Sequence, residues 1–159
     1  LSTAQAATPS IDPALAEAIS FMREEERLAR DLYAALEAVH GAGTTPFANI
    51  KLSEQQHFER VGYLLDRYGL DDPSAGLPAG DFAFAELDEL YADLYASGSA
   101  SLAGAYAAGI AVEEADIVDL TGTIELSTDA TVDRVLERLR DASGNHLAAF
   151  ERSAARLAR

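Results

Sequence analysis

The sequence predicts an all-α protein, an antiparallel four-helix bundle in which a crossover carries an extra short helix. Four long segments repeat apolar residues at spacings of three and four, which is the period of a helix face that packs into a bundle core. The composition is 48% hydrophobic and contains no Trp or Cys, and its abundant Ala and Leu favour helices. The length of 159 residues suits a single domain. We expect that domain over residues 12–159, after a disordered segment over residues 1–11.

The first two helices each begin at a proline that follows a capping residue, and each ends at a glycine. Proline is favoured in the first helical turn, and glycine adopts the left-handed conformation that closes many helices. These signals predict helices over residues 13–40 and 46–68, and the short connection between them predicts an antiparallel hairpin. The residues that carry the signals are Asp12, Pro13, Gly41, Thr45, Pro46 and Gly69.

The rest of the chain is predicted to form a surface crossover, a short helix and two further long helices. The crossover contains Pro, Gly and Asp without periodicity. Ser97 and Gly98 are expected to end the short helix, and a cap over residues 127–129 precedes the last helix. The expected ranges are 70–81 for the crossover, 84–96 for the short helix, 101–120 or 101–126 for the third long helix and 130–158 for the fourth.

The core-facing side of the second helix carries two polar residues among apolar ones. Glu54 and His57 form a Glu-x-x-His pair, so one helical turn points both side chains toward the same interior region. An apolar core does not accept such a pair without compensation. The seven positions of this face are Phe47, Ile50, Glu54, His57, Val61, Leu64 and Tyr68.

The other long helices also carry polar residues near the middle of their apolar faces. On the first helix, periodicity alone leaves Glu25 and Glu26 equal, whereas Glu24 groups with Arg27 and Asp31 and is expected on a solvated face. Antiparallel packing brings the middles of the helices to one level of the bundle. The third and fourth helices contribute Glu113, Asp116 and His146, with Glu114 as the alternative on the third.

Acids at these positions need a positive partner inside the bundle. A buried carboxylate costs several kcal/mol of desolvation, and no Lys or Arg occupies the four apolar faces. Two divalent cations would balance four carboxylates and leave two histidines as neutral nitrogen ligands. Oxygen and nitrogen ligands without thiolate suit iron or manganese, with zinc as a redox-silent substitute. The predicted metal ligands are Glu26, Glu54, His57, Glu113, Asp116 and His146.

The same polar residues could also be balanced without a metal. The acids could share protons, or Arg23, Arg30 or Arg60 could reach around the helices to pair with them. A single core histidine such as His146 is commonly a packing residue that makes hydrogen bonds. Tyr33 is most simply a core aromatic residue, although its hydroxyl could bond to a metal ligand.

With these residues in place, the chain resembles the ferritin-like superfamily. Di-iron bundles of that superfamily supply one Glu from the first helix, Glu-x-x-His from the second, an acid from the third and Glu-x-x-His from the fourth. The chain more closely resembles a small prokaryotic ferritin-like family labelled a domain of unknown function, over nearly everything after residue 12. The stretches that carry this resemblance are FMREEERLARDLYAAL, FANIKLSEQQHFERVGYLLDRYGL, AGIAVEEADIVDL and SGNHLAAFER.

The resemblance favours Glu26 over Glu25 as a ligand and implies an iron site of one or two ions. Ser143 stands where the superfamily pattern has a Glu, which leaves a single metal or an asymmetric pair as alternatives. Rubrerythrins, which are more distantly similar, use a cysteine-bound iron for electron transfer. Because this chain has no cysteine, redox activity would need an external reductant.

Charge and resemblance together set the expected function. A formal net charge of −15 repels phosphate backbones and anionic lipids, so neither nucleic acid nor a membrane is expected as a partner. We expect a soluble protein, either cytoplasmic or exported with its signal peptide removed. The resemblance implies a metal-binding protein that reacts with dioxygen or peroxide as a di-metal oxidoreductase.

Two further functions compete with that expectation. The alternative is a non-enzymatic helical bundle whose metal site is structural or vestigial and which acts as an interaction module. A homodimer is expected, because the short helix that begins near Phe84 leaves apolar surface to cover. Iron storage in a shell ranks last, since nothing in the sequence marks the interfaces of a cage.

Overall fold

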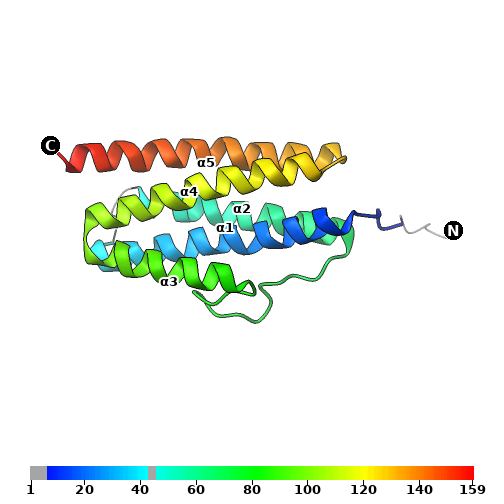
Figure 1. Ribbon diagram of the computed structural model, residues 1–159, viewed down its shortest axis with the longest axis horizontal. Helices are drawn as coiled ribbons and strands as arrows, with labels where there is room; N and C mark the ends of the chain where they lie inside the picture. The colour runs from blue at the N-terminus through cyan, green and yellow to red at the C-terminus, as the bar shows by residue number, and fades with distance from the viewer. Residues whose placement is uncertain (1–6, 43–45) are drawn as a thin grey trace.

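The computed structural model describes residues 7–42 and 46–159, and these residues form five helices and no strand. The helices are α1 (Pro13–His40), α2 (Phe47–Tyr68), α3 (Ala85–Ala100), α4 (Leu102–Leu126) and α5 (Ala130–Leu157). Figure 1 shows the four longer helices running along the length of the molecule, with the shorter α3 packed on α1 and α4. The predicted all-α bundle is therefore confirmed. Within the described ranges, no helix has the length and apolar character that a bilayer-spanning segment needs.

The first two helices follow their predicted ranges closely. Asp12 caps α1 by accepting a hydrogen bond from a backbone N–H at 2.8 Å, and Gly69 ends α2 in the left-handed conformation with a φ of 63°. α2 begins one residue later than predicted, because Pro46 serves as its N-cap. The start signal assigned to Thr45 lies outside the described residues, and so do residues 1–6 of the expected N-terminal segment.

Two predictions about glycine need correction. Gly41 ends α1 as expected, but with a φ of 117° and a ψ of 135° rather than in the left-handed helical conformation. Gly98 does not end α3, which continues four residues beyond the predicted end. A Cβ atom at Gly98 would lie 2.8 Å from Leu36 Cδ2, so this glycine serves the close packing of α3 on α1. Gly98, which the sequence suggested as a helix end, is instead a point of close contact between two helices.

The core contains two apolar clusters that follow one another along the bundle. One cluster is rich in aromatic rings, and Tyr33, Phe47 and Phe150 pack there with ring centroids 5.1–5.9 Å apart. The other cluster is mainly aliphatic and uses the first turns of α1 and the last turns of α2. The middles of the four long helices lie between them. The residues that the sequence predicts as metal ligands lie in these middle turns.

The crossover between α2 and α3 covers the face of α1 that was predicted to be solvated. Glu24, Arg27 and Asp31 are buried there, and we call these three residues the paired cluster. Backbone N–H groups of the crossover reach it, from Ala83 to Glu24 Oε2 at 2.9 Å and from Gly80 to Asp31 Oδ2 at 3.1 Å. The prediction that Glu24 is solvated is therefore wrong, because the periodicity of α1 does not indicate where a distant loop will pack.

Candidate metal centre

Six polar side chains from the four long helices meet in the middle of the bundle. Their fractional exposures lie between 1% and 9%, so water does not surround them. α1 and α5 contribute one residue each, whereas α2 and α4 contribute two each. We call this set the central cluster, and it consists of Glu26, Glu54, His57, Glu113, Asp116 and His146.

Glu54 lies at the centre of this cluster, between the two histidines. Its Oε2 is 3.0 Å from His57 Nδ1, and its Oε1 is 2.7 Å from His146 Nδ1. Glu26 Oε2 approaches His57 Nδ1 to 3.2 Å. Glu113 Oε2 approaches His146 Nδ1 to 3.5 Å. Two groups of three potential ligands result, each with its ligand atoms within 4.8 Å of one another, and both groups include Glu54.

Several atoms of the central cluster are buried without a hydrogen-bond partner among the residues that the structure describes. Although Glu54 Oε1 and His146 Nδ1 are 2.7 Å apart, the contact lacks hydrogen-bond geometry. A buried polar group without a partner costs about 1–3 kcal/mol. Cations placed among these atoms would satisfy them together. The unpaired atoms are Glu26 Oε1, Glu54 Oε1, Asp116 Oδ1 and His146 Nδ1.

Hydroxyl groups hold the two acids of α4 in place. Tyr33 donates a hydrogen bond to Glu113 Oε1 at 2.7 Å, and Ser143 lies 2.6 Å from Asp116 Oδ2, where it donates as well. The sequence identified Ser143 only as a missing carboxylate. Its proximity to Asp116 depends on how α4 and α5 pack, which no motif in either helix records.

Burial and like charges raise the pKa values of three acids in the central cluster. Burial, followed by repulsion from Glu54, raises the pKa of Glu113 to about 8 and that of Asp116 to about 7. Burial is also the main reason why the pKa of Glu26 lies well above its usual range. Without a cation, these acids hold protons at pH values where exposed carboxylates have lost theirs.

The histidines and Glu54 shift in the directions expected for close ion pairs. Burial opposes the charged form of His57, yet its contacts with Glu26 and Glu54 raise the pKa to about 11. Similar contacts with Glu113 and Glu54 overcome burial and raise the pKa of His146 to about 9. Burial is the largest influence on Glu54, but its two histidine neighbours outweigh it and lower the pKa to about 2. Protonated histidines therefore act as the internal counter-charges when no cation is bound.

None of the three arginines considered as partners forms an ion pair with the acids of the central cluster. Arg23 pairs with Asp72 at 2.7 Å, and Arg30 pairs with Asp31 at 2.7 Å. Arg60 lies on the exposed surface. In the described part of the chain, no guanidinium or ammonium group makes an ion pair with the central cluster.

Neither alternative acid, Glu25 or Glu114, belongs to the two groups of potential ligands. Glu114 is exposed on α4. Glu25 is buried with a fractional exposure of 3%. Asp116, although it is part of the central cluster, likewise belongs to neither group of potential ligands. Burial raises the pKa of Glu25, and repulsion from Asp116 and Asp119 of α4 raises it further. Of the two neighbours that periodicity left equal, Glu26 is the one beside His57.

Comparison with known proteins places this architecture among uncharacterized relatives. Residues 16–156 match a family described as an uncharacterized protein domain, DUF2202. The sequence is 38% identical over 136 residues to the uncharacterized protein MJ0754 of Methanocaldococcus jannaschii, over 86% of this chain and 72% of that protein. The fold is similar to the crystal structure of the hypothetical protein MJ0754 from Methanococcus jannaschii, with a TM-score of 0.89 and 34% identity. That likeness covers 98% of this chain and 87% of the other.

Proposed function

The chain belongs to the DUF2202 family, and we propose that its central cluster binds one or two iron or manganese ions, as in ferritin-like bundles. The observation that carries this proposal is the double set of ligands that shares Glu54. Several of its atoms are buried without partners. Four carboxylates without an arginine or lysine leave a negative charge that divalent cations balance.

The ligand atoms suggest how the ions would be divided. Glu26, Glu54 and His57 would hold one ion, and Glu54, Glu113 and His146 would hold the other. Glu54 would thus serve both groups, since one of its carboxylate oxygens lies near each histidine. Carboxylate and imidazole ligands suit iron or manganese, and zinc would fit the same atoms without redox chemistry.

The chain's own residues would prepare the site. Tyr33 and Ser143 would orient the acids of α4 through the hydrogen bonds described above. The two apolar clusters would border the site on either side along the bundle. Bound iron or manganese would supply redox chemistry toward dioxygen or peroxide, as the resemblance to the ferritin-like superfamily implies. Because the chain contains no cysteine, the electrons would come from an external reductant.

Metal analysis tests the proposal directly. Metal-free protein is titrated anaerobically with Fe²⁺, desalted and measured for iron. We expect about one to two ions per chain from the two ligand groups, and we expect Glu54→Gln to lose all of them because both groups need this carboxylate. Glu114→Gln is the matched control, since it removes one exposed carboxylate from the same bundle. Wild-type protein that stays free of iron would refute the proposal.

A structural role for the metal is the second candidate, and the depth of the cluster favours it. Glu54 has a fractional exposure of only 1% and lies against His146 of α5. His57, its neighbour on α2, approaches Glu26 of α1, and His146 approaches Glu113 of α4. A metal bound there would crosslink four helices. In that case, a chelator should lower the melting temperature while loaded protein consumes oxygen and peroxide no faster than the buffer does. Faster consumption would favour the redox function.

A further inference from the structure

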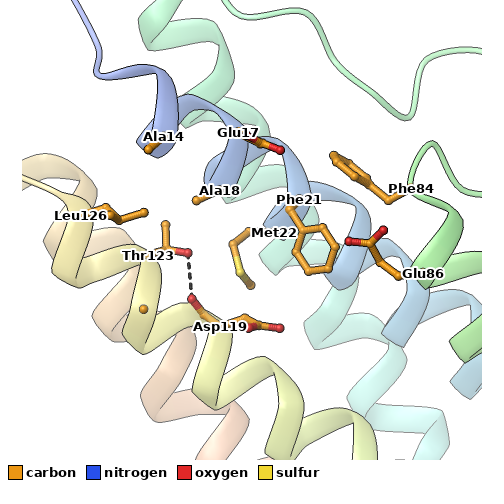
Figure 2. Close-up of a pocket in the computed structure, with 11 residues that line it drawn as sticks. Ala14, Glu17, Ala18, Phe21, Met22, Phe84, Glu86, Asp119, Thr123 and Leu126 are labelled. Atoms are coloured by element: carbon orange, nitrogen blue, oxygen red, sulfur yellow. Dashed lines mark hydrogen bonds between the residues drawn. The ribbon is translucent and has the colours of Figure 1, made fainter.

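A pocket with a volume of about 450 Å³ opens between α1 and α4, beside the start of α3. Figure 2 shows Phe21 and Met22 on its apolar side and the carboxylates of Glu17, Glu86 and Asp119 around it. Among the described residues, no Lys or Arg lines this pocket. We call it the acidic pocket. Its negative charge favours a cation.

The two helix faces that line the acidic pocket continue inward to buried acids. Met22 lines the pocket, and Glu25 lies one helical turn farther along the same face of α1. Asp119 also lines the pocket, and Asp116 lies one turn deeper on α4. Since Asp116 belongs to the central cluster, the acids Asp119, Glu25 and Asp116 form a continuous series from the pocket to that cluster.

Electrostatic repulsion between the acids and buried oxygens without partners support this series. Burial is the main reason why the pKa of Glu25 is raised, and the next causes are repulsion from Asp116, from Asp119 and from Glu26. The three carboxylates therefore lie close together. Glu25 Oε2 and Asp116 Oδ1 are buried and have no hydrogen-bond partner among the described residues. Unpaired carboxylate oxygens along one path are the ligands that a hard divalent cation prefers.

We propose that the acidic pocket is the entry for divalent cations and that Glu25 and Asp119 form a transit site on the way to the central cluster. This inference rests on the proposed function, because the cations need a binding site inside the bundle. The pocket has room for a hydrated ion, since six waters at about 30 Å³ each fill less than half of its volume. Asp119 would replace part of the hydration shell before Glu25 receives the ion.

Rates of metal uptake test the pathway separately from the site. Metal-free protein is mixed with Co²⁺, whose visible absorption reports binding, in a stopped-flow instrument. Asp119→Asn removes a carboxylate of the path. Gly122→Phe adds a ring to the pocket without removing any acid, and a Cβ atom at Gly122 meets nothing within 4 Å. We expect both variants to bind the wild-type amount of Co²⁺ about ten-fold more slowly, which is the lower end of electrostatic rate effects.

Two control variants isolate the pocket from general effects. Glu114→Gln removes an exposed carboxylate from the same helix as Asp119. Gly144→Phe adds the same ring as Gly122→Phe at a glycine of α5 that also has open space. Both should take up Co²⁺ at the wild-type rate. Wild-type rates in Asp119→Asn and Gly122→Phe, or equal slowing in the controls, would overturn the pathway alone. Wild-type protein that binds no Co²⁺ at equilibrium would overturn the metal site and the pathway together.

Discussion

Two groups of buried acids, one under the crossover on α1 and one in the middle of the bundle, are compensated in opposite ways. In the paired cluster, Arg27 donates to both oxygens of Glu24 at 3.0 and 3.1 Å, and the crossover adds backbone N–H groups. In the central cluster, no Lys or Arg of the described chain makes an ion pair, and several oxygens are left without partners. The chain thus supplies its own cation where acids fasten a loop. In the middle of the bundle, the negative charge of the acids must be neutralised by a bound ion or by protons.

Raising the pH should have the largest effect on the free energy of unfolding, and this effect should come from the central cluster rather than the paired cluster. The pKa of Glu113 is raised from 4.5 to about 8 by burial and by Glu54. The native state therefore holds a proton that the unfolded chain releases above pH 4.5, so the free energy of unfolding falls as the pH rises toward 8. Over the three pH units from pH 5 to pH 8, one such proton corresponds to a loss of about 4 kcal/mol. The raised pKa values of His57 and His146 act in the same direction above pH 6.5.

Urea denaturation of chelator-treated protein at pH 5 and pH 8 measures this loss. Glu113→Gln should flatten the pH dependence, because the amide cannot release a proton, whereas the exposed Glu114→Gln should keep it. Saturating Mn²⁺ should oppose the loss, since metal binding needs the deprotonated ligands and strengthens as the pH rises. A metal-free protein that becomes more stable from pH 5 to pH 8 would contradict the assignment of raised pKa values to the central cluster.

Removing the internal cation of the paired cluster should have the next largest effect. Arg27→Met leaves Glu24 buried without its guanidinium partner, and the backbone groups of the crossover do not carry a full charge. Breaking a buried ion pair from one side costs about 3 kcal/mol or more of unfolding free energy. This loss should be the same with and without metal. Thermal or urea denaturation under both conditions measures it.

Arg30→Met provides the comparison for this experiment. Arg30 also pairs with Asp31, but its side chain is 26% exposed, against 4% for Arg27. An ion pair that solvent reaches contributes at most about 1 kcal/mol. Equal losses in the two variants would mean that burial by the crossover does not set the strength of the paired cluster.

The fold was largely predictable because the bundle obeys the periodicity of single helices. Asp12 and Gly69 act as the capping residues that the sequence indicated. The errors arise where two segments meet. Gly98 has the sequence signature of a helix end, but its role is set by Leu36 on another helix. Glu24 has the periodicity of a solvated residue, but the path of the crossover buries it.

The central cluster was predictable in composition and less so in detail. An acid on an apolar face stands out because burial of a carboxylate is costly, and this singled out Glu54 and Glu113. The choice between Glu25 and Glu26 was not available from periodicity, since both side chains are buried. Their neighbours differ only after α4 has packed on α1. Whether the cluster holds metal stays a prediction for the titration described above.

Removing one hydroxyl group beside the central cluster should give the smallest effect. Tyr33→Phe keeps the ring packed against Phe47 and Phe150, but Glu113 loses a hydrogen bond of 2.7 Å. The loss should cost about 1 kcal/mol of unfolding free energy. If Glu113 is a ligand, the affinity for Mn²⁺ should also fall about ten-fold, because the partners of metal ligands orient them. Tyr63→Phe, at an exposed tyrosine, should change neither quantity.

The two measurements on Tyr33→Phe distinguish a positioning role from a structural one. Lower stability with unchanged Mn²⁺ affinity would mean that the hydroxyl only satisfies a buried acid, as the backbone groups of the crossover do for Glu24. A loss of affinity would instead mean that Glu113 must be held in one orientation for the ion. The contrast between the clusters then extends to their hydrogen bonds. Those of the paired cluster stabilise Glu24, whose charge Arg27 already neutralises. Those of the central cluster would prepare acids for a cation that comes from outside.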